Sequence, residues 1–130
     1  MTITVDNSSA GFSASSNWTL ATSSTDKFGA DYYYRSTAAV SDLATWSANI
    51  TSAGNYDISA WWSQGTNRAA AASYHMPDGT TVEVNQQTNG GAWRALGTKN
   101  LGTGAQEVGL SCWTTTGFVV VADAVRFVKP

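Results

Sequence analysis

The chain has 130 residues, a formal net charge of −2 and only 12% Asp, Glu, Lys and Arg, about half the ~25% usual in soluble domains. Such a length suits a single domain spanning residues 1–130, and the shortage of Lys and Glu argues against a mostly helical protein. The charge excludes nucleic-acid binding through a basic surface, and no apolar run reaches the roughly 20 residues of a membrane span.

Short runs in which polar and apolar residues alternate recur along the chain, and this period of two is typical of strands covered on one side. The runs are Thr2–Asp6, 42–50, 55–62, 82–85 and 107–112, and turn residues rich in Gly, Asn and Asp separate them. Residues 69–72 are too short for a helix and are interpreted as strand or irregular chain. The run Phe118–Val128 has β-branched residues on both faces and predicts one central strand. The pattern predicts an all-β, antiparallel, two-sheet β-sandwich.

Several short phrases, in a shared order and spacing, carry a resemblance to a known family. They include Val5-Asp6-Asn7, Asn17-Trp18, Gly29–Arg35, Ala44-Thr45-Trp46, Gly54-Asn55-Tyr56, Ala60-Trp61-Trp62, Val84–Gln87, Gly90–Thr98 and Ala122–Phe127. From about Val5 to Val128 the chain resembles the golvesin C-terminal and xanthan lyase carbohydrate-binding-like domain. It departs from that pattern at Ser111–Gly117, where a Cys-Trp pair replaces the expected short polar turn.

The resemblance implies a jelly-roll-like accessory module, usually appended to secreted bacterial enzymes, that binds polysaccharide or cell-surface glycan without catalysing a reaction. Low charge and many Ser, Thr and Asn residues fit the same extracellular, secreted location. The implied partner is a glycan, and no cofactor is expected.

Recognition of a sugar requires flat aromatic surface for the ring and planar polar groups for its hydroxyls. The candidate ligand-binding residues are Trp61, Trp93, Trp113, Tyr33, Arg35, Asn67 and Arg68. Strand alternation places Trp61 opposite Trp62, and Tyr33 opposite Tyr32 and Tyr34.

Two locations for the site are open. One is a solvent-facing sheet surface carrying Arg35 and Arg126, and the other is a loop rim carrying Trp18, Asn67, Arg68, Trp93 and Trp113. Trp46 and Trp62 are expected in the core, because a two-sheet domain of this size buries several aromatic side chains.

The residues for catalysis or metal binding are few. His75 and Cys112 are the only histidine and cysteine. Cys112 lies on the same strand face as Val108 and is expected to be a buried, inert thiol. No enzyme is therefore predicted. Asp6 and Asp123 would lie close together if the first and last strands are neighbours. They could then ligate Ca²⁺, or Asp123 could pair with Arg126 or Arg68.

Self-association is the alternative function. With few charges to protect its surface, the chain could bury the same Trp residues between subunits as a homo-oligomer or a filament.

Overall fold

Residues 1–130 were described in a computed structural model, whose regular structure consists of strands alone. In chain order they are β1 (Thr2–Asp6), β2 (Phe12–Ser13), β3 (Thr19–Ala21), β4 (Tyr32–Ser36), β5 (Ala44–Ile50), β6 (Gly54–Trp61), β7 (Ala72–His75), β8 (Thr81–Val84), β9 (Arg94–Leu101), β10 (Gly104–Leu110), β11 (Val119–Ala122) and β12 (Ala124–Val128). None of the chain forms a helix of the length and apolar character needed to cross a membrane.

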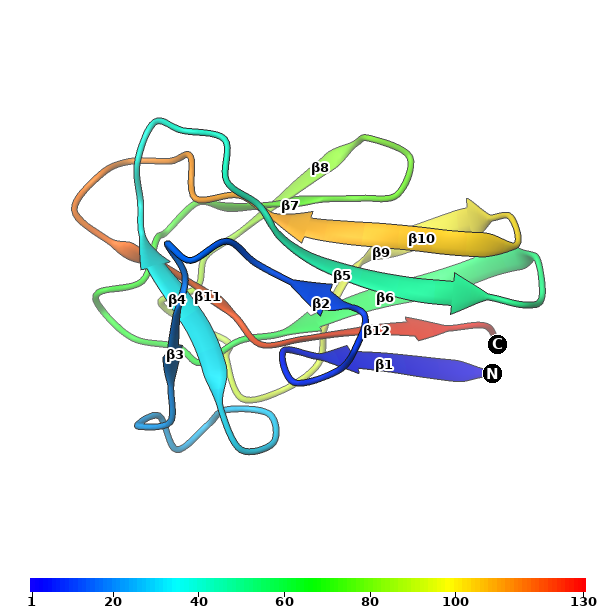
Figure 1. The fold of residues 1–130 in the computed structure, drawn as a ribbon, viewed down its shortest axis with the longest axis horizontal. Helices are drawn as coiled ribbons and strands as arrows, with labels where there is room; N and C mark the ends of the chain where they lie inside the picture. The colour runs from blue at the N-terminus through cyan, green and yellow to red at the C-terminus, as the bar shows by residue number, and fades with distance from the viewer.

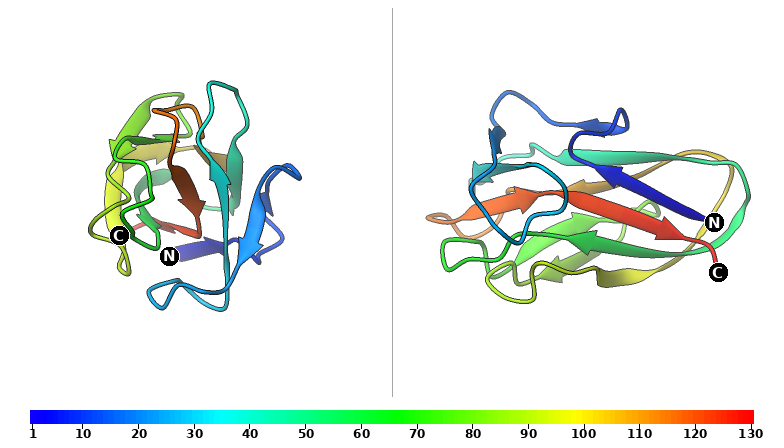
Figure 2. Two further views of the ribbon diagram at one scale, coloured as in Figure 1. Left: turned by 90° about the vertical axis from the view of Figure 1, so that its left-hand side faces the viewer. Right: turned by 90° about the horizontal axis from the view of Figure 1, so that it is seen from below.

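The strands form three hydrogen-bonded sheets in which every paired strand is antiparallel (Figure 1). Sheet A has the order β1-β12-β6-β9, sheet B the order β2-β5-β10-β7-β8, and the small sheet C the order β11-β4-β3. Sheets A and B are the two layers of the sandwich, and sheet C lies at one end (Figure 2). The predicted antiparallel sandwich is therefore confirmed, with sheet C as an addition.

Both termini lie together at one end of the sandwich because β1 pairs with β12 along its whole length (Figure 1). The loops around sheet C lie at the opposite end. We refer to that region as the loop end.

The core forms where the apolar faces of the two sheets meet. Trp46 of β5 and Tyr56 and Ile58 of β6 have no exposed surface, and the alternate residues of both strands are more exposed, as their period of two requires. The predicted core positions of Trp46 and Trp62 are confirmed. Each indole N–H still finds an acceptor, Asp123 O at 3.2 Å for Trp46 and Thr88 O at 3.0 Å for Trp62.

The single strand predicted for Phe118–Val128 is wrong in one respect, because the run is divided at Asp123. Residues before Asp123 form β11 and pair with β4 in sheet C, whereas those after it form β12, between β1 and β6 in sheet A. The chain thus changes sheets at Asp123, the only acidic residue of this mostly apolar segment.

The prediction that Trp18 lies on the loop rim is also wrong. Its side chain is 4% exposed and belongs to the core. A turn closed by the Trp18 N–H and the Ser15 carbonyl, 3.1 Å apart, precedes β3 and directs the indole inward.

Candidate functional site

A pocket of about 260 Å³ opens at the loop end, between β3, β4, the start of β11 and the loop after β6. We call it the loop-end pocket; its walls are Ala21, Ser23, Tyr32, Tyr34, Asn67, Arg68 and Val119. The pairing of β3 with β4 sets Ala21 opposite Tyr32. A parallel bridge between Arg68 and Val119 brings the loop against β11. The sequence-predicted pair Asn67 and Arg68 therefore lies in one cavity.

The Arg68 guanidinium is held rigidly but is not neutralised. It donates to the Ser63 carbonyl at 3.1 Å, to the hydroxyls of Ser63 and Ser24 at 3.1 and 3.2 Å, and to the Asn67 side-chain oxygen. These bonds use four of the five N–H donors of a guanidinium. The ion pairs of the protein are Arg35–Asp42 and Lys99–Asp78, so no carboxylate faces Arg68. One donor and a full positive charge remain at the pocket wall.

The positive charge of Arg68 affects the pKa of the Tyr32 hydroxyl. Burial alone would raise the pKa of Tyr32, but hydrogen bonding with Ser23 and Ser24 and the nearby Arg68 charge outweigh it, so the pKa is lowered. The Ser24 hydroxyl donates to the Tyr32 oxygen over 2.9 Å. The pocket thus favours negative charge, and it contains no carboxylate or histidine that could act as a general acid or base.

The predicted residues Trp61 and Trp93 meet on the outer side of sheet A, where both contact Phe28. The Trp61–Trp93, Phe28–Trp61 and Phe28–Trp93 ring centroids lie 5.6, 5.5 and 5.2 Å apart. The Trp61 indole donates to the Asp26 carbonyl at 2.8 Å. Both indoles are half-buried and hold the 22–31 loop, which supplies Ser24 to Arg68. Direct contact of either indole with a ligand stays a prediction.

Two other predicted residues lie outside the pocket. Tyr33 points away from Tyr32 and Tyr34, as the alternation predicts, but its ring stacks on Phe12 with centroids 5.4 Å apart and packs against the core. Tyr33 is half-buried, and its contact with a ligand stays a prediction.

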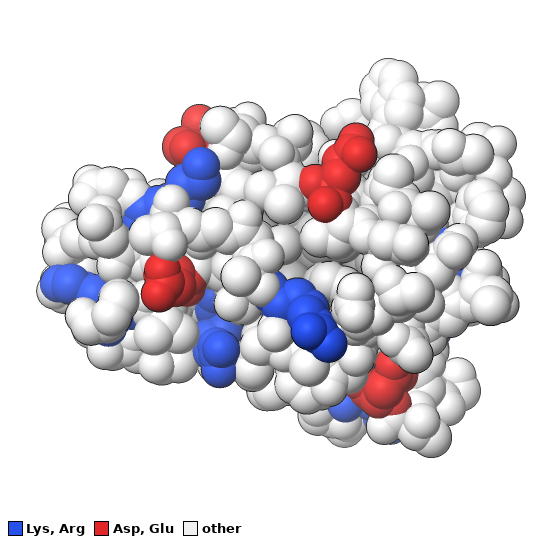
Figure 3. Space-filling view, turned by 180° about the vertical axis from the view of Figure 1, so that it is seen from behind, with Lys and Arg blue, Asp and Glu red and all other residues white.

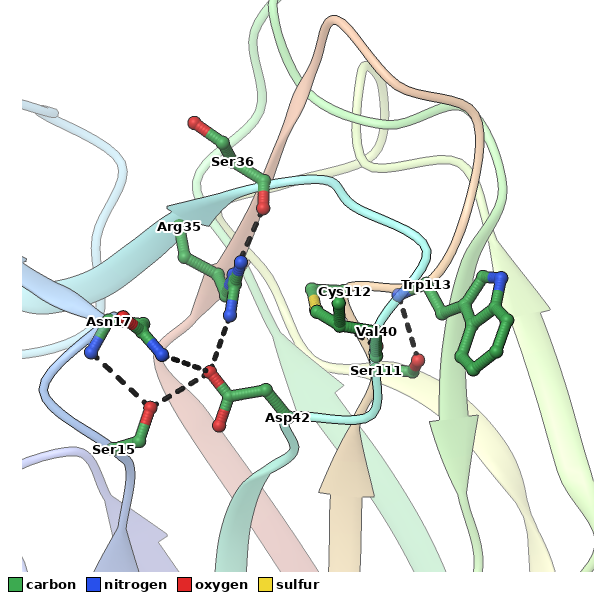
Figure 4. A network of polar contacts seen from close by, with 9 residues as sticks. All are labelled: Ser15, Asn17, Arg35, Ser36, Val40, Asp42, Ser111, Cys112 and Trp113. Carbon is green, nitrogen blue, oxygen red and sulfur yellow. Dashed lines mark hydrogen bonds and ion pairs between the residues drawn. The ribbon is translucent and has the colours of Figure 1, made fainter.

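Arg35 lies in a separate polar network with Asp42 (Figure 4). The Asp42 carboxylate also accepts from Ser15 at 2.8 Å. Partial burial opposes ionisation of Asp42, but the bonds from Ser15, Arg35 and Asn17 outweigh it and lower its pKa. The network ties the chain before β3 to β4 and leaves Arg35 paired.

Trp113 is the most exposed of the large apolar side chains, at 60%, and Val40 near it is 45% exposed (Figure 4). A small, mostly apolar slot of about 160 Å³ lies beside Thr114 and Thr115, closed by Phe118 and the Ala69–Ala71 segment. Phe118 directly precedes Val119, and Ala69 directly follows Arg68, so the slot and the loop-end pocket border the same two segments.

The pairing of β1 with β12 brings Asp6 and Asp123 together, as expected, but neither Arg126 nor Arg68 pairs with Asp123. Asp123 is fully buried and accepts from the Phe28 N–H at 2.8 Å. Burial, together with the nearby Asp6 charge, raises the pKa of Asp123 to about 8, and its second carboxyl oxygen is buried without a hydrogen-bond partner. No three His, Cys, Asp or Glu side chains converge to hold a metal ion.

Cys112 is buried as predicted, with its sulfur 3.5 Å from the Val40 carbonyl oxygen. His75 lies elsewhere, in a shallow depression on the outer side of sheet B.

Sequence reasoning missed the pocket residues Ser23, Tyr32 and Tyr34 and the loop residue Phe28. Alternation correctly separated Tyr33 from its two neighbours, but it could not say which side faces the pocket. That choice depends on sheet C, whose β3 has only three residues and no alternation signal.

Comparison with known proteins agrees with this fold. A xanthan lyase of Bacillus sp. (strain GL1) is 31% identical over 134 residues, covering 97% of this chain and 14% of that protein. A solved Paenibacillus xanthan lyase superposes with a TM-score of 0.87 at 34% identity, over 99% of this chain and 13% of that one. The chain therefore spans about one seventh of these relatives.

Isolated carbohydrate-binding modules share the fold at lower identity. The CBM35 module of Cellvibrio japonicus Abf62 superposes with a TM-score of 0.75 at 19% identity, covering 99% of this chain and 94% of that module. A Xyl-CBM35 module solved with a glucuronic acid containing disaccharide has a TM-score of 0.70 at 20% identity, covering 98% of this chain and 93% of that module. The family model described as "Golvesin C-terminal domain" matches residues 3–129, and the chain belongs to this family.

Proposed function

We propose that residues 1–130 form a non-catalytic module that binds polysaccharide at the loop-end pocket, with a preference for sugars that carry a carboxylate. The observation that carries the proposal is the charged, unneutralised Arg68 guanidinium in a pocket lined by Tyr32, Tyr34 and Asn67. A guanidinium suits a carboxylate oxygen, and Tyr and Asn side chains suit ring faces and hydroxyls.

The neighbouring modules support the proposal. Xyl-CBM35 holds a disaccharide containing glucuronic acid, and this chain shares its fold. The relatives that share 31–34% identity are xanthan lyases, so an extracellular setting beside polysaccharide fits this chain as well.

Trp113 extends the proposed site. Trp113 directly precedes Thr114 and Thr115 of the apolar slot, and the slot and the loop-end pocket border the same two segments. An indole that is 60% exposed offers a flat face for a second sugar ring.

Filling the pocket tests the proposal. Ala21→Leu places a larger side chain in the cavity without removing any Arg68 hydrogen bond, and Arg68→Gln removes the charge. Either change is expected to weaken binding of acidic polysaccharide by about tenfold or more, because a charge-assisted bond or the ring site is lost. Isothermal titration with acidic and neutral oligosaccharides measures this.

The matched control is Lys129→Gln, which removes one positive charge at the terminal end of the sandwich. It is expected to change affinity less than twofold. Because the partly buried guanidinium bonds of Arg68 also support the fold, Ala21→Leu decides the outcome if Arg68→Gln unfolds. Full affinity in Ala21→Leu would contradict the proposal.

Self-association is the second candidate function, favoured by the exposed Trp113 and Val40 side chains. Two copies meeting through this apolar pair would remove both from water. The expected result is then a mass that rises with concentration in light scattering, and Trp113→Ser should return it to the monomer value. A constant monomer mass at all concentrations would exclude this candidate.

A further inference from the structure

A groove of about 340 Å³ crosses the outer surface of sheet A, away from the loop-end pocket. Cross-strand pairing builds it from two rows: Arg126 lies opposite Ser59, and Val128 lies opposite Asp57, on strands β12 and β6. On β9 the rows continue through Ala95 and Thr98. We call this depression the sheet A groove.

A β-bulge between β6 and β9 lies at the base of the groove. The register between β6 and β9 shifts at Ile58/Ser59, and Gly97 lies beside the shift with a φ of 148°. A side chain there would meet no atom within 4 Å, so the space above Gly97 is open. Bulges of this kind often redirect side chains near functional sites.

Arg126 is the unusual residue of this groove. Its guanidinium lies over the Trp93 ring, 4.6 Å from the ring centre. Its Nε atom is buried without a hydrogen-bond partner, and the protein's two ion pairs involve other residues. A guanidinium with unmet donors at the wall of a groove lacks an oxygen-rich partner.

Arg126 is the only basic side chain among the groove's lining residues. Outside the lining, Arg94 and Lys99 lie on β9 and Lys129 follows β12, and basic and acidic side chains are interspersed on this face of the molecule (Figure 3). Lys99 pairs with Asp78, and Lys129 donates to Ser52, so Arg126 is the basic residue left without a protein partner at the groove. At the other end, the Asp57 carboxylate accepts from Thr98 at 2.5 Å and has capacity for a further hydroxyl.

We infer that the sheet A groove is a second saccharide site, which binds a carboxylate-bearing sugar on Arg126 and a sugar hydroxyl on Asp57. The inference rests on the proposed function for the ligand class but uses none of the loop-end residues. Trp93 acts here as a positioning residue, because it holds the guanidinium in place for a two-oxygen contact.

Titration of the whole chain with a short oligogalacturonate, followed by amide NMR, tests the inference. Amides of Ala95 and Gly97 are expected to shift with added ligand. Arg126→Gln should lower affinity at these signals at least tenfold, and Ser59→Leu, which fills the groove, should abolish their shifts. Arg94→Gln is the matched control, with the same charge change on the same sheet, and should change affinity less than twofold.

The two sites are distinguished by their own variants. Groove shifts that persist in the pocket variant Ala21→Leu support the second site whatever the fate of the loop-end pocket. Shifts confined to Asn67 and Arg68 leave the proposed function standing and overturn the groove. Shifts at neither site overturn both, and a methyl-esterified oligogalacturonate that binds the groove equally well overturns the role of Arg126 as the carboxylate partner.

Discussion

Replacing Asp123 with Asn is expected to remove most of the pH dependence of folding stability between about pH 5 and pH 8, and to make the protein more stable than the wild type at the upper end of this range. Asp123 is fully buried beside Asp6, and this burial raises its pKa from 3.8 to about 8. The folded state therefore keeps a proton that the unfolded state releases near pH 4.

The sign follows from this difference in bound protons. Because the folded pKa lies above the unfolded value, the stabilisation is fully present below about pH 4 and is lost as the pH rises to about 8. The loss is at most about 1.4 kcal/mol for each pH unit in the window. Burial also raises the pKa of Asp6, which adds a change in the same direction.

Asparagine imitates the protonated carboxyl. Its side-chain oxygen can accept from the Phe28 N–H, and its amide can donate toward Asp6, so the contact with Phe28 survives without an ionisable group. Urea unfolding at a series of pH values measures the slope, with a chelator present so that no divalent cation neutralises the pair.

Asp78→Asn is the matched control for this experiment. Asp78 is solvent-exposed, and its hydrogen bonds with Lys99 and Thr80 lower its pKa, so its contribution changes only in acid. Asp78→Asn should keep the wild-type slope above about pH 5. An Asp123→Asn protein with that same slope would show that the buried carboxyl is ionised in the fold.

The alternation of polar and apolar side chains was enough to predict most of the sandwich. It placed the first strand at Thr2–Asp6, as observed, and it located β5 and β6 to within two residues. Each of these strands has one buried face, and a strand of this kind alternates polar and apolar residues with a period of two.

The same signal fails where a strand is buried on both sides. Val119–Ala122 and Ala124–Val128 together form one mostly apolar run in the sequence, because both strands pack against the core; β12 lies between β1 and β6, whereas β11 is an edge strand of sheet C. The sheet change occurs at Asp123, whose carboxyl group accepts from the Phe28 N–H, and Phe28 lies 95 residues earlier in the chain.

The sequence was enough to predict the residue types of the candidate site, but not which of these residues lie in the same pocket. Asn67 and Arg68 meet in one pocket because they are adjacent in the sequence, whereas Arg35 lies against Asp42 in another network. Contacts between residues far apart in the sequence determine which arginine has no acidic partner. Arg126, on a regular strand, showed no local sign that it would stack on Trp93.

Gln86→Leu is expected to lower the free energy of unfolding by about 2–6 kcal/mol, because two buried backbone groups lose their partners at about 1–3 kcal/mol each. Gln86 is fully buried after β8. Its amide donates to the Val121 carbonyl at 2.9 Å and accepts from the Val121 N–H at 2.9 Å. On this side of β11 the side chain serves as a substitute for a neighbouring strand.

Leucine fills a similar volume but offers no hydrogen bond, so packing alone cannot compensate the loss. Gln86→Glu separates the two bonds. At neutral pH its carboxylate can still accept from the Val121 N–H but cannot donate to the Val121 carbonyl, whereas at low pH the protonated form regains the donor. Gln86→Glu should therefore be less destabilising in acid than at neutral pH.

Gln106→Leu is the control, because the Gln106 amide donates only to the exposed Gly102 carbonyl. This substitution should lower the free energy of unfolding by less than about 1 kcal/mol. If Gln86→Leu unfolds within about 0.5 kcal/mol of the wild type, the strand β11 does not depend on this amide.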